Sequence, residues 1–276
     1  MTAMVSLGSD NDPALTTRSV LASMLLGSTP PRLPVAVLVR AGDMFGFTEG
    51  SVRTALSRMA ASGELRRDAQ GWYGLQGDLL TRQSRQGESR SALTSQWSGR
   101  WRLAVVDPGA RSATDRAALR DALLRLRFAE QREGVWLRPD NLDSRSQQHP
   151  WQLADAQCRW FLAEPEFTFE QNEQEFVANL WSLSQWATRA TELRRKMHEL
   201  MAPLQQRDIS ALAPGFVVSA AVLRHFLADP LLPRELLPRH WPGAALRADY
   251  DQYDTTYREA LDEWVRQPAP PLPSRS

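Results

Sequence analysis

The chain of 276 residues has one cysteine, one lysine and no long apolar run. Its single cysteine, Cys158, cannot form an intramolecular disulfide or a thiolate zinc cluster. No run approaches the roughly 18 consecutive apolar residues that indicate a membrane-spanning helix. The N-terminal segment also lacks the basic region and apolar stretch of a secretory signal. We therefore expect a cytoplasmic protein, and its length predicts two or three domains.

Charge is distributed unevenly along the chain, although the formal net charge is only +1. Residues 1–150 carry 20 arginines and 15 acidic residues, whereas residues 151–276 carry 13 basic and 17 acidic residues. The excess is greatest in residues 16–105, which have 12 arginines and 6 acidic residues. A basic segment in a nearly neutral chain indicates a polyanionic partner, and guanidinium forks suit phosphates and guanine edges.

The first part of the chain has the pattern of three helices followed by a β-hairpin. Apolar periodicity predicts helices at residues 17–26, 34–44 and 49–61, the third of them capped by a threonine. Two short strands, Glu64–Arg67 and Trp72–Leu75, flank a turn rich in Asp, Gln and Gly. This order predicts a winged helix-turn-helix domain at residues 16–77.

The third predicted helix has one apolar and one polar face. Val52, Ala55, Leu56 and Met59 follow the spacing of a buried face. The opposite side carries short hydroxyls and arginines without a carboxylate, which suits a major groove about 12 Å wide. Arginines that begin the wing suit phosphate or minor-groove contact. The predicted DNA-binding residues are Ser51, Arg53, Thr54, Ser57, Arg58, Arg66 and Arg67. The alternative is a solvated polar face on an ordinary three-helix unit.

The remaining residues predict an α+β protein with two further domains. Strands at 100–106, 134–138 and 157–163, with a helix at 114–128, indicate a ferredoxin-like domain at residues 98–172. Helical patterns then continue over residues 173–267. We expect residues 78–97 to form a linker, and residues 1–15 and 268–276 to be disordered tails.

Four blocks of this sequence resemble the PaaX family, the repressors of phenylacetate degradation. They are GSVRTALSRMAASGEL at 50–65, WSGRWRLAVVD at 97–107, GVWLRPDNL at 134–142 and AAVLRHFLADPLLPRELLPRHWPGAAL at 220–246. The blocks occur in the family's order, and the resemblance covers most of residues 17–265. Two stretches, 143–156 and the acidic 164–175, resemble nothing that we can place.

The resemblance implies an N-terminal winged helix, a central ferredoxin-like domain similar to a CRISPR adaptation nuclease, and a helical C-terminal domain. It also implies a cytoplasmic homodimer that represses genes of aromatic, phenylacetate-like catabolism from an inverted-repeat operator in double-stranded DNA. An aryl-CoA or acyl-CoA effector such as phenylacetyl-CoA would release the repressor. We expect no enzyme activity, no catalytic residues, no metal and no cofactor.

Residues of the matching 134–142 block are candidates for the effector site. Arg138 is expected either to meet an effector phosphate or to cap a helix of the C-terminal domain, and Trp136 to line an aromatic pocket. Two alternatives stay open. One is a metal-dependent nuclease that uses Asp107, although an Asp before Pro-Gly is more often a turn residue. The other is a DNA-binding scaffold without an effector, which recruits a partner through residues 164–175.

Overall fold

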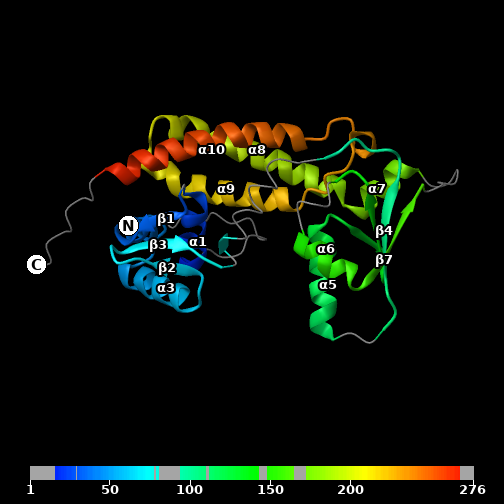
Figure 1. Ribbon diagram of the computed structural model, residues 1–276. Coiled ribbons are helices and arrows are strands. Elements are labelled where there is room, and N and C mark those ends of the chain that lie inside the picture. Colours follow the sequence, from blue (N-terminus) through cyan, green and yellow to red (C-terminus); the bar gives the residue numbers. More distant parts are fainter. Residues whose placement is uncertain are drawn as a thin grey trace, which may run out of the picture. The chain divides into compact units, whose positions relative to one another are not determined.

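A computed structural model describes residues 16–28, 30–77, 79–80, 94–109, 112–142, 148–164 and 172–267 (Figure 1). The expected tails, and most of the expected linker, lie outside the described residues. The contacts divide the chain into two units. The first comprises Met1–Gly87, Arg195–Ala221 and Asp249–Ser276, and the second comprises Glu88–Arg194 and Val222–Ala248. The C-terminal helices, expected to form a domain of their own, are thus shared between the two units.

The N-terminal part of the first unit has winged-helix topology. Its helices are α1 (Thr17–Gly27), α2 (Val35–Met44) and α3 (Glu49–Ala61), and its strands are β1 (Arg32–Pro34), β2 (Leu65–Arg67) and β3 (Trp72–Leu75). The strands form an antiparallel sheet in the order β1-β3-β2. The three helices and the β2-β3 hairpin confirm the sequence prediction. Strand β1 was not predicted, because three residues between prolines give no periodic signal.

Local capping explains where the helices of the winged helix begin. The Thr16 hydroxyl accepts a hydrogen bond from the amide of Ser19, whose own hydroxyl accepts one from the Thr16 amide, so α1 begins with a capping box. Pro34 occupies the N-cap position of α2. The sequence predicted Pro34 as the first residue of the helix, whereas it precedes that residue. At the N-cap position the fixed φ of proline still suits the entry to a helix. The cap of α3 is Thr48, as predicted.

The three helices of the winged helix pack around a core of aliphatic side chains. Leu21 and Leu25 of α1, Leu38 of α2, and Val52 and Leu56 of α3 are completely buried. At one point α2 and α3 approach so closely that only glycine fits. A Cβ on Gly42 would lie 2.3 Å from Cγ2 of Val52. This contact sets the spacing between α2 and the helix predicted to enter DNA.

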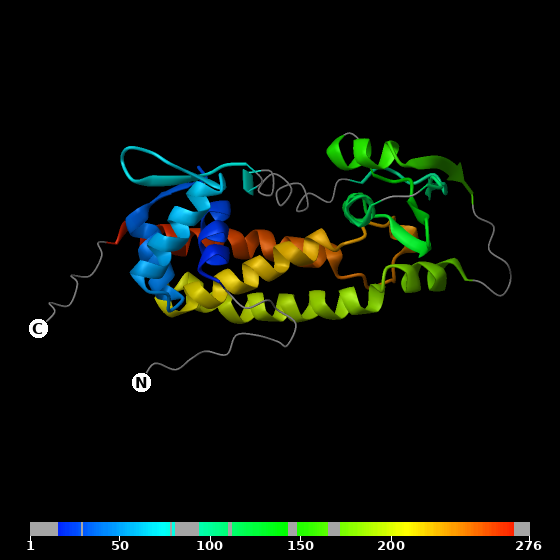
Figure 2. The ribbon, with the colours of Figure 1, turned by 90° about the horizontal axis from the view of Figure 1, so that it is seen from below.

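The first unit also contains parts of three long C-terminal helices, α8 (Leu183–Gln205), α9 (Leu212–Leu227, after the 3-10 turn Ile209–Ala211) and α10 (Gly243–Arg266). The end of α10 lies beside the helices of the winged helix (Figure 2). Arg40 donates to the carbonyls of Trp264 and Gln267, and its guanidinium stacks on the Trp264 ring at 4.4 Å. Arg258 donates to the carbonyl of Gly27 at the end of α1. These arginines therefore attach the winged helix to the C-terminal helices.

Among the described residues, the segment Ile209–Leu227 has the length and hydropathy of a membrane-spanning helix. In this fold its apolar side chains serve packing, since Phe216 and Val222 are buried and Phe216 contacts the Phe45 ring edge-on. Gly215 lets α10 approach, because a Cβ there would lie 3.0 Å from the Tyr257 ring. These side chains of the segment therefore pack in the protein interior.

The second unit is built on a four-stranded antiparallel sheet in the order β5-β6-β4-β7. The strands are β4 (Trp101–Val106), β5 (Ala129–Arg132), β6 (Val135–Pro139) and β7 (Cys158–Ala163). The helices α5 (Ala113–Arg125) and α6 (Gln148–Asp155) complete a β-α-β-β-α-β order, which confirms the ferredoxin-like prediction. Strand β5 and helix α6 were not predicted. Strand β5 (AEQR) lacks alternation, and α6 contains a proline and buries fully only Ala154.

Alternate residues along the strands supply two separate cores. Ala104, Trp136 and Cys158 pack with Leu119 and Leu123 of α5 on one face, which α5 and α6 cover. The other face carries Trp101 and Leu137. It packs against α7 (Glu173–Leu180), the first residue of α8 and the segment around the 3-10 turn Arg234–Leu236, through the side chains Val177, Leu183, Leu232 and Leu236. Because both faces are covered, the sheet is an interior layer of this unit.

We predict that Gly42→Ala destabilises the protein by roughly 1–3 kcal/mol, because the new methyl group overlaps Val52 and must push α3 away. The matched control is Gly50→Ala on the outer face of α3, where a Cβ meets no atom within 4 Å. That variant should gain up to ~1 kcal/mol from the helix propensity of alanine. Urea unfolding, followed by circular dichroism, measures both. Equal stability of the two variants would contradict the tight α2–α3 contact.

We also predict that stability falls as the pH is lowered from about 6.5 to about 4. Burial lowers the pKa of His225 to about 4 from an ordinary 6.5, and the ring stacks on Trp186 at 4.2 Å. Between these values the unfolded chain binds a proton that the folded chain excludes, so acid favours unfolding. The expected loss is roughly 1–2 kcal/mol, less than the full linkage value because the ring is only partly buried.

The matched variant for this experiment is His225→Phe, which keeps an aromatic ring on Trp186 but cannot titrate. Its free energy of unfolding should change less than that of the wild type between pH 7 and pH 4.5. Parallel pH profiles for the two proteins would show that His225 does not cause the loss.

Candidate nucleic-acid interface

Helix α3 is held at a fixed rotation by its cap and its apolar face. The Thr48 hydroxyl accepts from the Ser51 amide at 3.3 Å and lies 2.9 Å from the Ser51 hydroxyl. Val52, Leu56 and Met59 are buried beneath the helix. Since successive helical residues are about 100° apart, burying these three positions directs the others outward.

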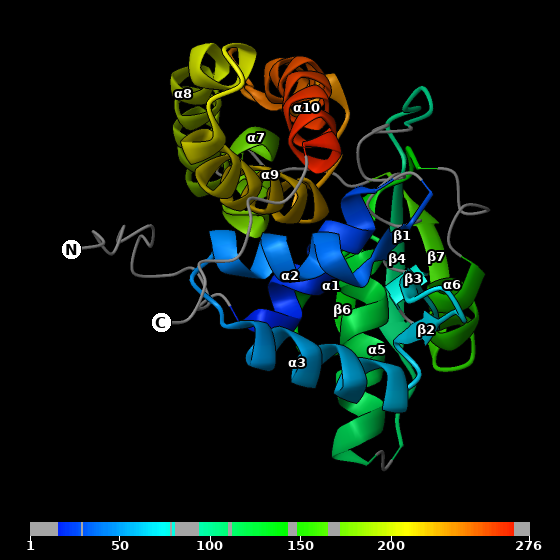
Figure 3. The same ribbon diagram turned by 90° about the vertical axis from the view of Figure 1, so that its left-hand side faces the viewer.

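All seven predicted DNA-contacting residues have exposed side chains. They are Ser51, Arg53, Thr54, Ser57 and Arg58 of α3, and Arg66 and Arg67 of β2. Helix α3 lies on the side of the winged helix that faces away from α10 (Figure 3). The C-terminal helices of the first unit therefore leave this face open.

The wing side of α3 brings an arginine of the helix together with an arginine of the hairpin. Arg53, Ser57 and Ala60 of α3 line a hollow of about 310 Å³ together with Arg67 and Tyr73 of the hairpin. The Arg67 guanidinium lies over the Tyr73 ring, 5.9 Å from its centroid. Residues 53 and 67 are distant in sequence but share one concave, cationic surface.

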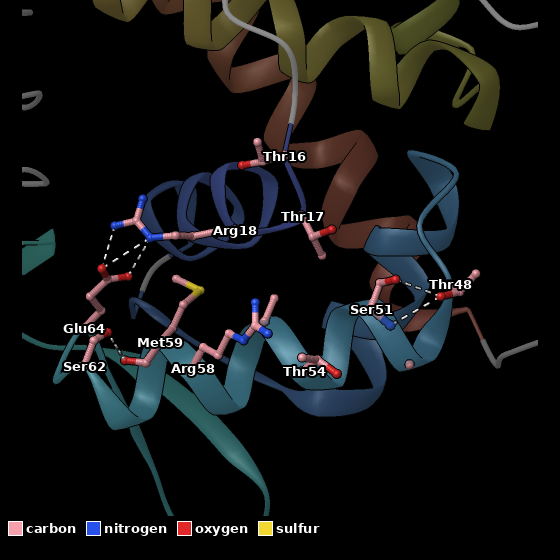
Figure 4. A pocket seen from close by; sticks show the side chains of 12 residues that line it. Thr16, Thr17, Arg18, Thr48, Ser51, Thr54, Arg58, Met59, Ser62 and Glu64 are labelled. Carbon is pink, nitrogen blue, oxygen red and sulfur yellow. Dashed lines mark hydrogen bonds and ion pairs between the residues drawn. The ribbon is translucent and has the colours of Figure 1, made fainter.

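The opposite side of α3 faces the beginning of α1 across a hollow of about 760 Å³ (Figure 4). Ser51, Thr54 and Arg58 project into it from α3, and the hydroxyl-bearing Thr16 and Thr17 line its other wall. These two threonines were missed by the sequence reasoning, because no pattern in α1 points toward α3.

One arginine at the edge of this hollow is already paired. Arg18 donates to both carboxylate oxygens of Glu64, at 2.6 and 3.0 Å, and this pairing raises the pKa of Arg18. It ties the start of α1 to the residue before β2. Arg58 has no ion pair with any residue that the structure describes, and is the free cation of this hollow.

The centre of the exposed face is made of small residues. By helical geometry Gly50, Thr54, Ser57 and Ala61 lie between Arg53 on one side and Arg58 on the other. Small side chains let the helix backbone approach a flat or grooved surface, while the flanking arginines reach further. This arrangement is suited to insertion of the helix into a major groove.

The Arg53 side chain is oriented by a neighbour on the same helix. Its Nε donates to Oε1 of Glu49 at 2.7 Å, which leaves both terminal nitrogens pointing away from the ion pair. Both side chains are more than half exposed, so the pair contributes only about 0.3–0.5 kcal/mol. Such a pair orients the guanidinium without preventing it from binding an anion or a guanine edge.

The wing is a short hairpin with an ordered turn. The Asp68 carboxylate accepts from the amides of Gln70 and Trp72 at 3.0 and 2.9 Å. Arg32 of β1 stacks on the Trp72 ring at 4.6 Å and adds a cation that the sequence reasoning did not include. It could not be found from sequence, because only the pairing of β1 with β3 brings it to the wing.

The two residues expected to contact an effector are instead part of the interior of the second unit. Arg138 is 3% exposed, and its three nitrogens donate to the carbonyls of Pro139 and Leu126 and to Oδ1 of Asn141. Trp136 is also 3% exposed and belongs to the core beneath α5. We correct both assignments to structural roles. Arg138 does cap a helix, but the helix is α5 of the central domain.

Asp107, the residue on which the nuclease alternative depends, lies beside a guanidinium. Its Oδ1 is 2.7 Å from Nε of Arg159. Among the described residues no group of three or more His, Cys, Asp or Glu side chains is placed to hold a metal ion.

Three helices, a small wing and a basic exposed third helix define the class of winged-helix proteins. Family models then match most of the chain: a PaaX-like protein model at residues 16–79, a PaaX protein central Cas2-like domain at 94–174, and a PaaX-like protein C-terminal domain at 181–267. The chain belongs to the PaaX family. It is therefore a PaaX-like regulator, a class for which DNA binding is implied.

A solved structure supports the fold over nearly the whole chain. The uncharacterized protein Rv0674 from Mycobacterium tuberculosis is 38% identical, with a TM-score of 0.70, and the match covers 91% of this chain and 99% of that one. No curated protein matches the sequence.

Proposed function

We propose that this protein is a transcriptional repressor that reads its operator with α3 and its wing. The observation that carries the proposal is the shared hollow in which Arg53 and Ser57 of α3 meet Arg67 of the hairpin. A recognition helix and a basic wing that share a concave face fit a duplex, whose groove and flanking phosphates have to be contacted together.

Each part of this face has a role in the proposed complex. The small residues of α3 approach the floor of the major groove, and the fork of Arg53 contacts O6 and N7 of a guanine. On the α1 side, Arg58 and the hydroxyl of Ser51 contact phosphates. Arg66 and Arg67 contact the neighbouring backbone or minor groove.

The repressor is proposed to act as a homodimer on an inverted repeat. One α3 reads only a few base pairs, and two copies related by a two-fold axis would place their helices about 34 Å apart, one turn of DNA. Membership in the PaaX family supports control of aromatic, phenylacetate-like catabolism and release by an aryl-CoA or acyl-CoA. Such an effector would bind the state with low DNA affinity more tightly and shift the population toward it.

We predict that Arg53→Ala weakens binding to the preferred DNA site by roughly 1–3 kcal/mol and relaxes the base preference at one position. The site is first selected from a random duplex library with the wild-type protein. The matched control is Arg195→Ala on α8, which removes an arginine of similar exposure from an ion pair with Glu199. Fluorescence anisotropy at fixed salt measures both variants.

The control variant should bind within about twofold of the wild type, because its charge lies on a C-terminal helix. Equal losses of affinity in both variants would show a general electrostatic effect and would contradict the assignment of α3 as the recognition helix. An unchanged affinity of Arg53→Ala would also contradict that assignment.

We predict that Glu49→Ala reduces the ratio between the protein's affinity for its preferred DNA site and its affinity for non-specific DNA. Without its carboxylate, repulsion of the phosphates is weaker, so affinity for scrambled DNA rises. The Arg53 guanidinium loses its orienting partner, so affinity for the preferred site rises less than affinity for scrambled DNA. The measured quantity is the ratio of the two dissociation constants at two salt concentrations. An unchanged ratio would contradict an orienting role for Glu49.

A further inference from the structure

The second unit contains a hollow of about 750 Å³ between the segment 229–239 and the start of α10. Three arginines line it, together with apolar side chains and a tryptophan. We refer to it as the arginine hollow, and its principal residues are Leu231, Arg234, Leu237, Arg239, Trp241 and Arg247. A concave space of this size is typical of sites for small organic ligands.

The arginine hollow has more positive than negative charge. Arg234, Arg239 and Arg247 face two acidic residues, Asp229 and Glu235. Asp229 is buried and committed to Arg247, with 2.8 Å between Oδ2 and Nη1. Arg234 and Arg239 are exposed and form no ion pair with any residue that the structure describes. With Asp229 committed to Arg247, Arg234 and Arg239 outnumber Glu235 at the edge of the cavity, and this excess of positive charge favours an anionic ligand.

The base of the hollow contains hydrogen-bond donors that nothing in the described chain satisfies. Nη1 of Arg247 donates to Asp229 and to the carbonyl of Gly243, but Nε and Nη2 are buried and have no hydrogen-bond partner. The guanidinium lies over the Phe226 ring at 4.8 Å. Buried donors without partners are unusual and costly, and the guanidinium at this position is therefore not fully satisfied by the described chain.

One wall of the hollow is apolar and aromatic. Leu231 and Leu237 line it with Trp241, whose ring stacks on Trp186 at 4.5 Å. A Cβ on Gly243 would lie 2.6 Å from Nε1 of Trp241, so only glycine permits this position of the indole. The arginines and the apolar wall together match a ligand with a negative group and an apolar body.

The wall is held in place by the buried network around Arg138. Arg138 bonds Oδ1 of Asn141, and Nδ2 of Asn141 donates to the carbonyl of Leu231 at 2.9 Å. The Leu231 amide in turn donates to Oδ1 of Asp229 at 3.0 Å. Leu231 has a φ of 51°, which is uncommon for a leucine and is maintained by these bonds. The hollow is therefore preformed rather than dependent on ligand.

We propose that the arginine hollow binds an organic anion that carries an aromatic or aliphatic body. Arg234 and Arg239 bind its carboxylate or phosphate, and the body lies against Leu231, Leu237 and Trp241. This inference deepens the proposed function, since the ligand would be the effector. Ligand binding itself does not depend on the DNA-binding role.

The test is calorimetric titration of the full-length protein, without DNA, using three probes. Phenylacetate offers a carboxylate with an aromatic body, coenzyme A offers phosphates without that body, and phenylacetyl-CoA offers phosphates with it. The Arg234→Ala/Arg239→Ala double variant removes the free cations, which lie at the exposed edge, and leaves the buried Arg247 in place. The control is Arg159→Ala, an exposed arginine of β7 in the same unit.

We expect saturable binding of phenylacetate or of phenylacetyl-CoA, weakened roughly tenfold to a hundredfold in the double variant and unchanged in the control. Binding of the free carboxylate identifies the carboxylate as the anchored group. Binding of the thioester, with weak binding of coenzyme A, identifies a phosphate and the apolar body. Circular dichroism and thermal unfolding confirm that the variants are folded.

The proposal is overturned if neither phenylacetate nor phenylacetyl-CoA binds at millimolar concentration, or if the double variant binds as well as the wild type. Anisotropy with the selected DNA site is measured separately. If Arg53→Ala loses DNA binding but no ligand binds the wild type, the DNA-binding function is supported and the ligand site is contradicted. If a ligand binds but no DNA site can be selected, the ligand site is supported and the DNA-binding function is contradicted.

Discussion

The second unit depends on one buried cation. Arg138 lies near the end of strand β6 with its guanidinium in the interior, where burial lowers its pKa to about 9, so it remains charged near neutral pH. A buried charge is tolerated only when it is fully hydrogen-bonded, and each nitrogen of Arg138 has an acceptor. Those acceptors lie at the end of α5, on the last residue of β6, and on Asn141, which holds Leu231. A single side chain thus fixes the end of a helix, the end of an inner strand and the wall of a cavity.

The arginines of the winged helix act in the opposite way. Arg53, Arg58, Arg66 and Arg67 are exposed, and Arg53 has only a weak pair with Glu49. Their charges remain solvated and available, which is what contact with phosphates requires. The buried contacts beneath them, above all the approach of Val52 to Gly42, determine the direction of α3. The same residue type is therefore buried and fully bonded at position 138 but exposed to solvent on α3 and the wing.

The sequence-based predictions agree with the structure where an element depends on contacts between neighbouring residues. The α3 helix could be predicted because its cap at Thr48 and its apolar face at Val52, Leu56 and Met59 are local patterns. The exposed face follows directly from them. Arg138 and Trp136, which were assigned to the effector site, are instead buried in this structure, because they lie on an inner strand of the sheet. Strand alternation alone does not show whether both faces of a sheet are covered, and here both are.

By itself the sequence determined the winged helix, the ferredoxin-like order and the basic outer face of α3, since periodicity, capping and charge are properties of neighbouring residues. Only the tertiary structure decided that Arg53 and Arg67 share a hollow, that Arg138 is internal, and that Arg234, Arg239 and Arg247 surround one cavity. These relations join residues on different secondary-structure elements. Packing and strand pairing bring them together, and no local pattern encodes which distant partner a side chain will meet.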